Sequence, residues 1–204
     1  MKKLILSMAL IGATTLAFGQ KKVVRSADKN FKSGDLTEAL ADIKTASADP
    51  ETGADPATYL LKAQIETKIF ASDSSNTDET IAKGEAALDT YNKAFEMAGS
   101  NKEDGVGEEV YTEDMPGVPD NLRPYSIFTL KNLSFDKALE RYNSEDLNLA
   151  YEFFNQAGKI DLTDTRANDK AGYIAKDLGT YEEAKMNFGY LFDIQDYNKF
   201  TGYY

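Results

Sequence analysis

The chain has 204 residues, of which 34 are Asp or Glu, 23 are Lys or Arg, and none is His, Cys or Trp. The absence of His and Cys excludes Ser-His-Asp and Cys-His nucleophiles, zinc sites with His or Cys ligands, iron–sulfur clusters and ordinary haem ligation. The net charge of −11 makes nucleic acid and anionic lipid unfavourable partners, because phosphate binding requires clustered Lys and Arg. Catalysis by carboxylates, Lys, Tyr or an oxygen-ligated metal remains open, but none of these has a recognisable signature in the sequence. We expect no cofactor, no metal site and no enzymatic activity.

Residues 1–19 have the three-part pattern of a secretory signal peptide. Two lysines precede an apolar stretch over residues 4–18, and small residues surround a cleavage site before Gln20. The apolar stretch is shorter than the roughly 20 residues that span a bilayer. Cleavage would leave a periplasmic or secreted chain with no stable membrane insertion, because no Cys is present for lipidation. A retained membrane anchor is the alternative.

The rest of the chain contains a recurring pattern of Ala, then Ile or an aromatic residue four positions on, then Ala three positions further. The copies are Ala39, Ile43 and Ala46; Ala87, Tyr91 and Ala94; Ala150, Phe154 and Ala157; and, more loosely, Ala184, Phe188 and Leu191. Positions i, i+4 and i+7 lie on one face of a helix, so each copy predicts a helix with two small residues around a large one. Small residues let two helix axes approach closely, which predicts that this face packs against another helix.

A second small residue precedes each copy, usually by twelve positions, and the two positions are separated by turn signals. These small residues are Ala27, Ala63, Ala138 and Gly172. In the first and last copies, Gly34 and Gly179 are followed by the N-cap candidates Asp35 and Thr180, with a Glu three residues after each cap. The sequence therefore predicts helix-turn-helix hairpins.

These features resemble the tetratricopeptide repeat family, in which a small residue in the first helix, a Gly turn and an Ala-x3-aromatic-x2-Ala second helix recur. The resemblance implies an all-α fold: an α-solenoid of about four hairpins in a right-handed superhelix, spanning residues 20–204. The expected units are residues 21–52, 56–98, 122–162 and 165–198. Departures from the family pattern are Glu145 in place of the turn Gly and a closing proline that only Pro50 resembles.

Two insertions lengthen the spacing between units. Residues 72–78 form a polar loop inside the second unit, with Asn76 and Glu79 as a capping start for the next helix. Residues 99–121 contain seven acids and one base, which is typical of a solvated loop or a partner-facing loop. A calcium site is disfavoured, because the order of the acids does not match an EF-hand loop.

The resemblance also implies a concave groove that binds peptide segments of other proteins. By family position, the residues facing it are Asp28, Phe31, Lys32, Gln64, Thr67, Lys68, Tyr142, Asn143, Arg166, Asp169, Tyr173 and Lys176. The alternative for each residue is a solvated helix face. At the C-terminus, the fourth unit would close near Asn198. The aromatic and aliphatic residues from Tyr190 onward predict a tail that packs back, an apolar face that awaits a partner, or a chain that is part of a longer array, and we favour the last two.

The leading hypothesis is a non-enzymatic scaffold of the bacterial cell envelope that binds a protein or peptide partner in this groove. One alternative is a carboxylate-dependent hydrolase of envelope glycan acting through Glu108, Glu109, Glu113 and Asp114. Another is a structural module that self-associates through the apolar C-terminal face.

Overall fold

The computed structural model of the chain describes residues 21–192, apart from the side chain of Asn121. The predicted signal peptide at residues 1–19 and the end of the fourth unit lie outside the described residues. Within the described part the secondary structure is helical, without β-strands, and the all-α prediction is confirmed. The helices in chain order are residues 21–33, α2 (Leu36–Ala48), the 3-10 turn η1 (Thr52–Ala54), α3 (Pro56–Ser72), α4 (Asp78–Met97), α5 (Gly105–Val110), the 3-10 turn η2 (Asp120–Leu122), α6 (Ile127–Asn143), α7 (Leu147–Ile160), α8 (Thr165–Leu178) and α9 (Tyr181–Phe192).

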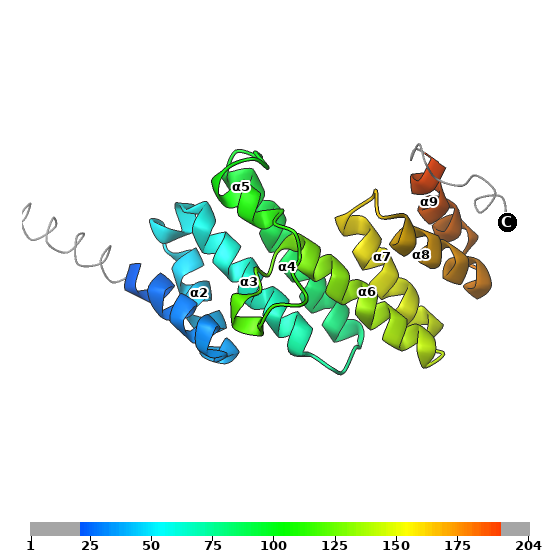
Figure 1. Ribbon diagram of the computed structural model, residues 1–204, viewed down its shortest axis with the longest axis horizontal. Helices are drawn as coiled ribbons and strands as arrows, with labels where there is room; N and C mark the ends of the chain where they lie inside the picture. The colour runs from blue at the N-terminus through cyan, green and yellow to red at the C-terminus, as the bar shows by residue number, and fades with distance from the viewer. Residues whose placement is uncertain (1–20, 193–204) are drawn as a thin grey trace, which may run out of the picture.

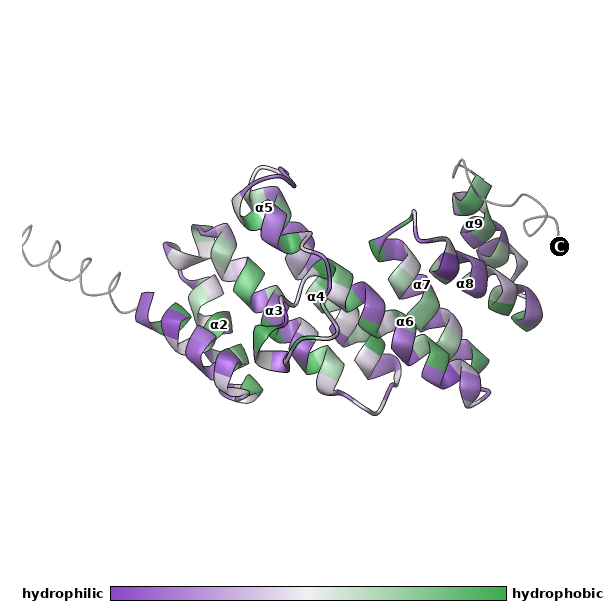
Figure 2. Ribbon diagram, viewed as in Figure 1, coloured by the Kyte–Doolittle hydropathy of each residue, from purple (hydrophilic) through white to green (hydrophobic). Residues whose placement is uncertain are grey.

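The long helices pack as adjacent pairs that follow one another along the molecule (Figure 1). Among residues 21–192 the pairs are residues 21–33 with α2, α3 with α4, α6 with α7, and α8 with α9. Each helix carries both apolar and polar residues, as expected for elements that bury one face (Figure 2). The described chain is therefore a row of helical hairpins, as the repeat pattern predicts.

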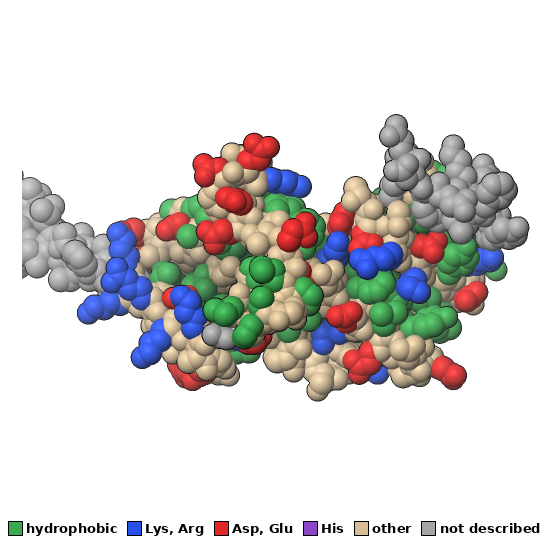
Figure 3. Space-filling view, in the orientation of Figure 1, with side chains coloured by type: hydrophobic (Ala, Val, Ile, Leu, Met, Phe, Trp, Pro, Cys, Tyr) green, Lys and Arg blue, Asp and Glu red, His purple; other side chains and the backbone are tan. Residues whose placement is uncertain are grey.

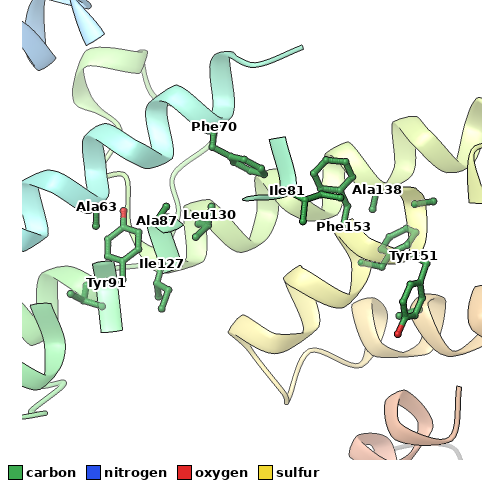
Figure 4. Packing of buried hydrophobic residues seen from close by; sticks show 14 of the residues in the cluster. Ala63, Phe70, Ile81, Ala87, Tyr91, Ile127, Leu130, Ala138, Tyr151 and Phe153 are labelled. Atoms are coloured by element: carbon green, nitrogen blue, oxygen red, sulfur yellow. The ribbon is translucent and has the colours of Figure 1, made fainter. Parts of the chain in front are cut away.

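The small residues of the pattern lie in the crowded core. Ala27, Ala63, Ala138 and the six alanines of the first three copies are all fully buried. Figure 4 shows Ala63 and Ala87 beside the ring of Tyr91, within one cluster of buried residues. At Gly172, an added Cβ would lie 2.6 Å from the ring of Phe188, so α8 and α9 approach each other too closely for any larger residue there.

The turns between paired helices use left-handed backbone and side-chain caps. Gly34 and Gly179 have φ values of 85° and 80°, a conformation that glycine adopts without strain. Asp35 caps α2 by accepting a hydrogen bond from the amide of Glu38 at 3.3 Å. Glu145 stands where glycine was expected and takes a φ of 64°, which strains a residue with a Cβ.

The loop between α3 and α4 differs from its prediction. The N-cap of α4 is Thr77, whose amide donates to the hydroxyl of Thr80 at 3.0 Å, so the expected cap at Asn76 is wrong. Asn76 is 1% exposed and donates to the carboxylate of Glu140, while the ammonium of Lys137 donates to its amide oxygen at 2.8 Å. Because both partners come from α6, Asn76 joins the second hairpin to the third.

The acidic insertion at 99–121 is packed onto the hairpins over part of its length, in contrast to the solvated loop that was expected. It contains α5, whose Val110 is fully buried, and the ring of Tyr111 makes edge contacts with Phe95 and Phe128. Figure 3 shows acidic side chains gathered over α5, so the outer surface of the insertion remains charged. Apolar residues between the acids explain why the segment folds back.

Candidate functional site

The first helices of the four pairs share one surface, which we call the first-helix face. It is formed by residues 21–33, α3, α6 and α8. The twelve residues predicted to line a groove all belong to these helices. The structure divides the face into two halves, because one half is covered by the chain itself and the other is open.

The covered half consists of residues 21–33 and α3. Residues 120–125 of the same chain lie across it. The ammonium of Lys68 pairs with Asp120 at 2.6 Å and lies 5.2 Å from the ring centre of Phe31. The side-chain amide of Gln64 donates to the carbonyl of Pro124 at 3.3 Å. The ring of Tyr125 meets the ring of Phe31 edge-on at 5.8 Å. Three predicted groove residues thus contact a segment of their own chain.

A buried tyrosine of α4 fixes the end of this segment. The hydroxyl of Tyr91 donates to the carbonyl of Tyr125 at 2.6 Å, and burial raises the pKa of the Tyr91 phenol. The Thr67 hydroxyl lies 3.2 Å from the Tyr91 hydroxyl and 2.8 Å from the carbonyl of Ala63, and its one proton is shared between these two acceptors. Thr67 is fully buried, so its predicted place in a groove is wrong: its side chain turns inward to satisfy Tyr91.

The remaining predicted residues of the first unit pair with each other. Lys32 and Asp28 form an exposed ion pair at 2.8 Å, one helical turn apart. Such pairs add little to stability because water screens them. At the other end of the face, Asn143 and Lys176 are exposed to solvent.

The open half contains two hollows between α6 and α8. The first, which we call the Arg166 hollow, has a volume of about 360 Å³ and is lined by Asp114, Pro116, Arg123, Asn132, Phe135, Asp136 and Arg166. The second, the Tyr142 hollow, has a volume of about 220 Å³ and is lined by Tyr142, Phe154, Asp169, Lys170, Tyr173, Ile174 and Asp177. Figure 3 shows apolar, basic and acidic side chains side by side over this end of the molecule.

The wall of the Arg166 hollow is held by two arginine–carboxylate pairs. Arg123 makes two hydrogen bonds to Asp114, at 2.9 and 2.8 Å, and Thr129 and Asn132 of α6 donate to the same carboxylate. The Asp114 side chain is 2% exposed. Burial by itself raises the pKa of Asp114, but these hydrogen bonds outweigh burial and bring the pKa below its ordinary value. Asp114 is therefore a charged structural anchor for the insertion.

Arg166 lies between a carboxylate and an aromatic ring. Its guanidinium pairs with Asp164 through two hydrogen bonds, at 3.1 and 2.8 Å, and lies 5.2 Å from the ring centre of Phe135. Burial raises the pKa of Asp164, but the hydrogen bond from Arg166 and the charge of Lys131 outweigh it, and the pKa falls from 3.8 to about 2. Desolvation in the hollow raises the pKa of Asp136.

The sequence prediction missed the three residues of α6 that line the Arg166 hollow: Asn132, Phe135 and Asp136. A signal was present in the spacing, because the predicted residues Arg166 and Asp169 lie six and three residues before the small residue Gly172. The same offsets from Ala138 give Asn132 and Phe135. Asp114 and Arg123 were missed because their positions depend on how the insertion folds.

The acids required by the hydrolase alternative do not come together as a pair. Glu108, Glu109 and Glu113 are exposed, whereas Asp114 is buried against Arg123. Within the described residues, no group of three or more carboxylates is arranged to hold a metal ion. In that same part of the chain, no helix combines the length and apolar character needed to cross a bilayer.

Comparison with protein-family models and with characterised proteins found no match for this chain. The resemblance to tetratricopeptide repeats therefore depends on the residue pattern, together with the paired helices described above.

Proposed function

We propose that the chain is a non-enzymatic binding protein that holds an extended segment of a partner protein on the open half of the first-helix face. The observation that supports this most strongly is the pair of neighbouring hollows between α6 and α8. Their volumes suit side chains of a bound segment, and their walls combine aromatic rings with charged and amide groups. Protein interfaces are enriched in such aromatic and Arg residues.

The chemistry of the open half favours recognition by packing and hydrogen bonds over recognition by charge. Arg123 and Arg166 are each neutralised by a bidentate carboxylate, so neither offers a free positive charge to an anion. Phe135 is half-buried and Tyr142 is 49% exposed, which leaves ring surface for an apolar or aromatic residue of the partner. A large share of the binding energy should come from burying these rings.

A photo-crosslinking amino acid at position 142 tests this proposal in the cell. Tyr142 lies on the proposed surface, and Asp89 is an exposed residue of α4 that serves as a matched control position. We expect a defined partner adduct from position 142 and none from position 89. Phe135→Ala should remove the adduct. Equal adducts from the two positions, or no effect of Phe135→Ala, would contradict the proposal.

We further propose that the partner lies in the bacterial cell envelope, because residues 1–19 have the pattern of an export signal. N-terminal sequencing of the protein recovered by osmotic shock tests this. The expected product begins at or near Gln20, whereas recovery of the intact chain from the cytoplasm would contradict export.

Self-association is a second candidate, favoured by apolar side chains on α9. Tyr181 is 70% exposed and Met186 is 43% exposed. Sedimentation at increasing protein concentration tests this candidate. A concentration-dependent dimer that Tyr181→Lys abolishes would support it, and a monomer throughout would exclude it.

A further inference from the structure

A lysine, an asparagine and a glutamate meet where the second hairpin contacts the third. The ammonium of Lys137, on α6, donates to the side-chain oxygen of Asn76 at 2.8 Å. The side-chain amide of Asn76 donates to the carboxylate of Glu140, also on α6, at 2.8 Å. Asn76 is 1% exposed and Lys137 is 8% exposed. The contact therefore places an amine, an amide carbonyl and a carboxylate in one hydrogen-bonded chain.

We propose that Lys137 and Asn76 react to form a covalent amide cross-link between their side chains, with Glu140 as the general base and acid. The Nζ atom of Lys137 forms a bond to Cγ of Asn76. The bond between Cγ and Nδ2 of Asn76 breaks, and Nδ2 leaves as ammonia. One amide replaces another, so the atoms balance without an oxidant, a reductant or a co-reactant. The proposal does not depend on binding at the first-helix face.

The surroundings of Lys137 favour the neutral amine that the reaction requires. Burial lowers the pKa of the Lys137 ammonium and the charge of Arg141 adds to this effect, which the charges of Asp73 and Glu140 oppose without cancelling it. The lowered pKa increases the fraction of neutral amine at a given pH, and only the neutral form has a lone pair for attack. The fully buried ring of Phe70 lies 5.1 Å from the same nitrogen and helps to exclude water.

The loop between α3 and α4 is held against α6 on both sides of the reacting groups. Lys137 also donates to the main-chain carbonyl of Asp73 at 2.6 Å, and Arg141 donates to the carbonyl of Ser75. A neutral amine can keep its bond to Asp73 while its lone pair turns toward Asn76. Because a carbonyl bond is about 1.2 Å long, the 2.8 Å contact with Oδ1 places Cγ no more than about 4 Å from the attacking nitrogen. Groups fixed in this way react far faster than groups that meet by diffusion.

Glu140 occupies the position that proton transfer requires. Its carboxylate accepts a hydrogen bond from the nitrogen that leaves, and Lys137 lies three residues earlier on the same face of α6. The carboxylate can take the proton that the attacking nitrogen gives up and return it to the departing nitrogen. Because Glu140 is exposed, the ammonia escapes into water, and its dilution drives the exchange forward.

The cross-link would join two hairpins that are otherwise held together by packing and hydrogen bonds. Its ends are 61 positions apart in the chain, and a covalent link between such distant positions restricts the unfolded state, as a disulfide does. The chain has no Cys, so it cannot form a disulfide. The amide would fix α6, which carries part of the open half of the first-helix face, against the second hairpin.

Peptide mapping by mass spectrometry after digestion with trypsin tests the proposal. In wild-type protein we expect a branched peptide in which residues 69–83 are joined to residues 132–141, because trypsin does not cleave after a lysine whose side chain is an amide. Its mass should be lower than that of the two linear peptides together by one molecule of ammonia. Lys137→Arg should lose the branched peptide completely and give residues 69–83 and 132–137 as separate peptides.

The role of Glu140 is tested by the rate at which the branched peptide accumulates after cell-free synthesis. We expect Glu140→Gln to form it at least about 100-fold more slowly than wild type, because a positioned acid–base group contributes a rate factor of this size. Glu85→Gln, which replaces an exposed carboxylate of α4, is the matched control and should react at the wild-type rate.

Thermal unfolding followed by circular dichroism checks that each variant is folded, and the wild-type map decides the main point even if Lys137→Arg does not fold. Recovery of only the linear peptides from folded wild-type protein would overturn the proposal. Equal rates for wild type and Glu140→Gln would overturn the role of Glu140.

Discussion

A close contact between the second and third hairpins gives a quantitative test of how the pairs are joined. Gly84 of α4 packs against Gln156 of α7, and an added Cβ would lie 2.6 Å from the Oε1 atom and 2.7 Å from the Nε2 atom. Gln156 is 2% exposed. Its amide donates to the carbonyl of Ile81 and accepts from Ser134 of α6, both at 2.9 Å. A single side chain therefore joins three helices.

Gly84→Ala should destabilise the protein although alanine favours helices. The gain in helix propensity is about 0.8–1.0 kcal/mol. To admit the methyl group, Gln156 must leave its position, which loses two buried hydrogen bonds of about 1 kcal/mol each and leaves polar atoms unpaired at about 1–3 kcal/mol. We expect the free energy of unfolding to fall by about 2–4 kcal/mol.

Gly189→Ala is the matched control. Gly189 lies in α9 with nothing within 4 Å of an added Cβ, so only the propensity term applies, and we expect stabilisation of up to about 1 kcal/mol. Urea unfolding of both variants, with Gln156→Ala and the double variant to complete a cycle, measures the coupling. Stabilisation by Gly84→Ala, or additive effects of Gly84→Ala and Gln156→Ala, would refute the reasoning.

Glu145→Gly should stabilise the protein by about 1 kcal/mol in urea unfolding, because glycine relieves the left-handed backbone at this turn; a loss of stability would count against the turn geometry. Lys137→Met should destabilise it by about 2–3 kcal/mol, since the buried ammonium donates to Asn76 and to a main-chain carbonyl of the same loop, and no change in the unfolding midpoint would refute this role. Because the folded-state pKa values of Asp114 and Asp164 are depressed, their contribution to stability is complete above pH 3.8 and is lost as the pH falls through the folded-state pKa of each group, which is about 2 for Asp164. Asp114→Asn should flatten the fall of the thermal midpoint over that range, and an unchanged pH profile would contradict this.

The helices and their close crossings could be predicted because both depend on local information. The spacing of Ala87, Tyr91 and Ala94 places three residues on one helical face, and burial of all three follows from that periodicity. The turn at Gly34 and the cap at Asp35 were equally local. For these residues, which have local partners, the prediction agreed with the structure.

The predictions that were wrong concern residues with distant partners. Asn76 has the sequence context of a cap, yet its partners lie on α6, more than 60 positions away in the chain. Thr67 has the spacing of a groove residue, but Tyr91 draws it inward. In the sequence, Asp114 cannot be distinguished from the acidic residues beside it. In the structure, Arg123 pairs with it. Contacts between residues this far apart leave no periodic pattern in the sequence, so they could not be predicted from it.

The division of the first-helix face into two halves could not be predicted for the same reason. Phe31 and Tyr125 are far apart in the chain, and each by itself is an ordinary aromatic residue. Only the folded insertion brings them together and separates a covered half from an open one.

The division of the face into these halves is the central claim, and ring-to-ring nuclear Overhauser effects test it most directly. In protein protonated only at phenylalanine and tyrosine rings, we predict cross-peaks between Phe31 and Tyr125, whose ring centres are 5.8 Å apart. Tyr125→Leu should remove them and identify their origin. Absence of these cross-peaks in the folded wild-type protein would show that residues 120–125 do not cover the face, and would contradict the account.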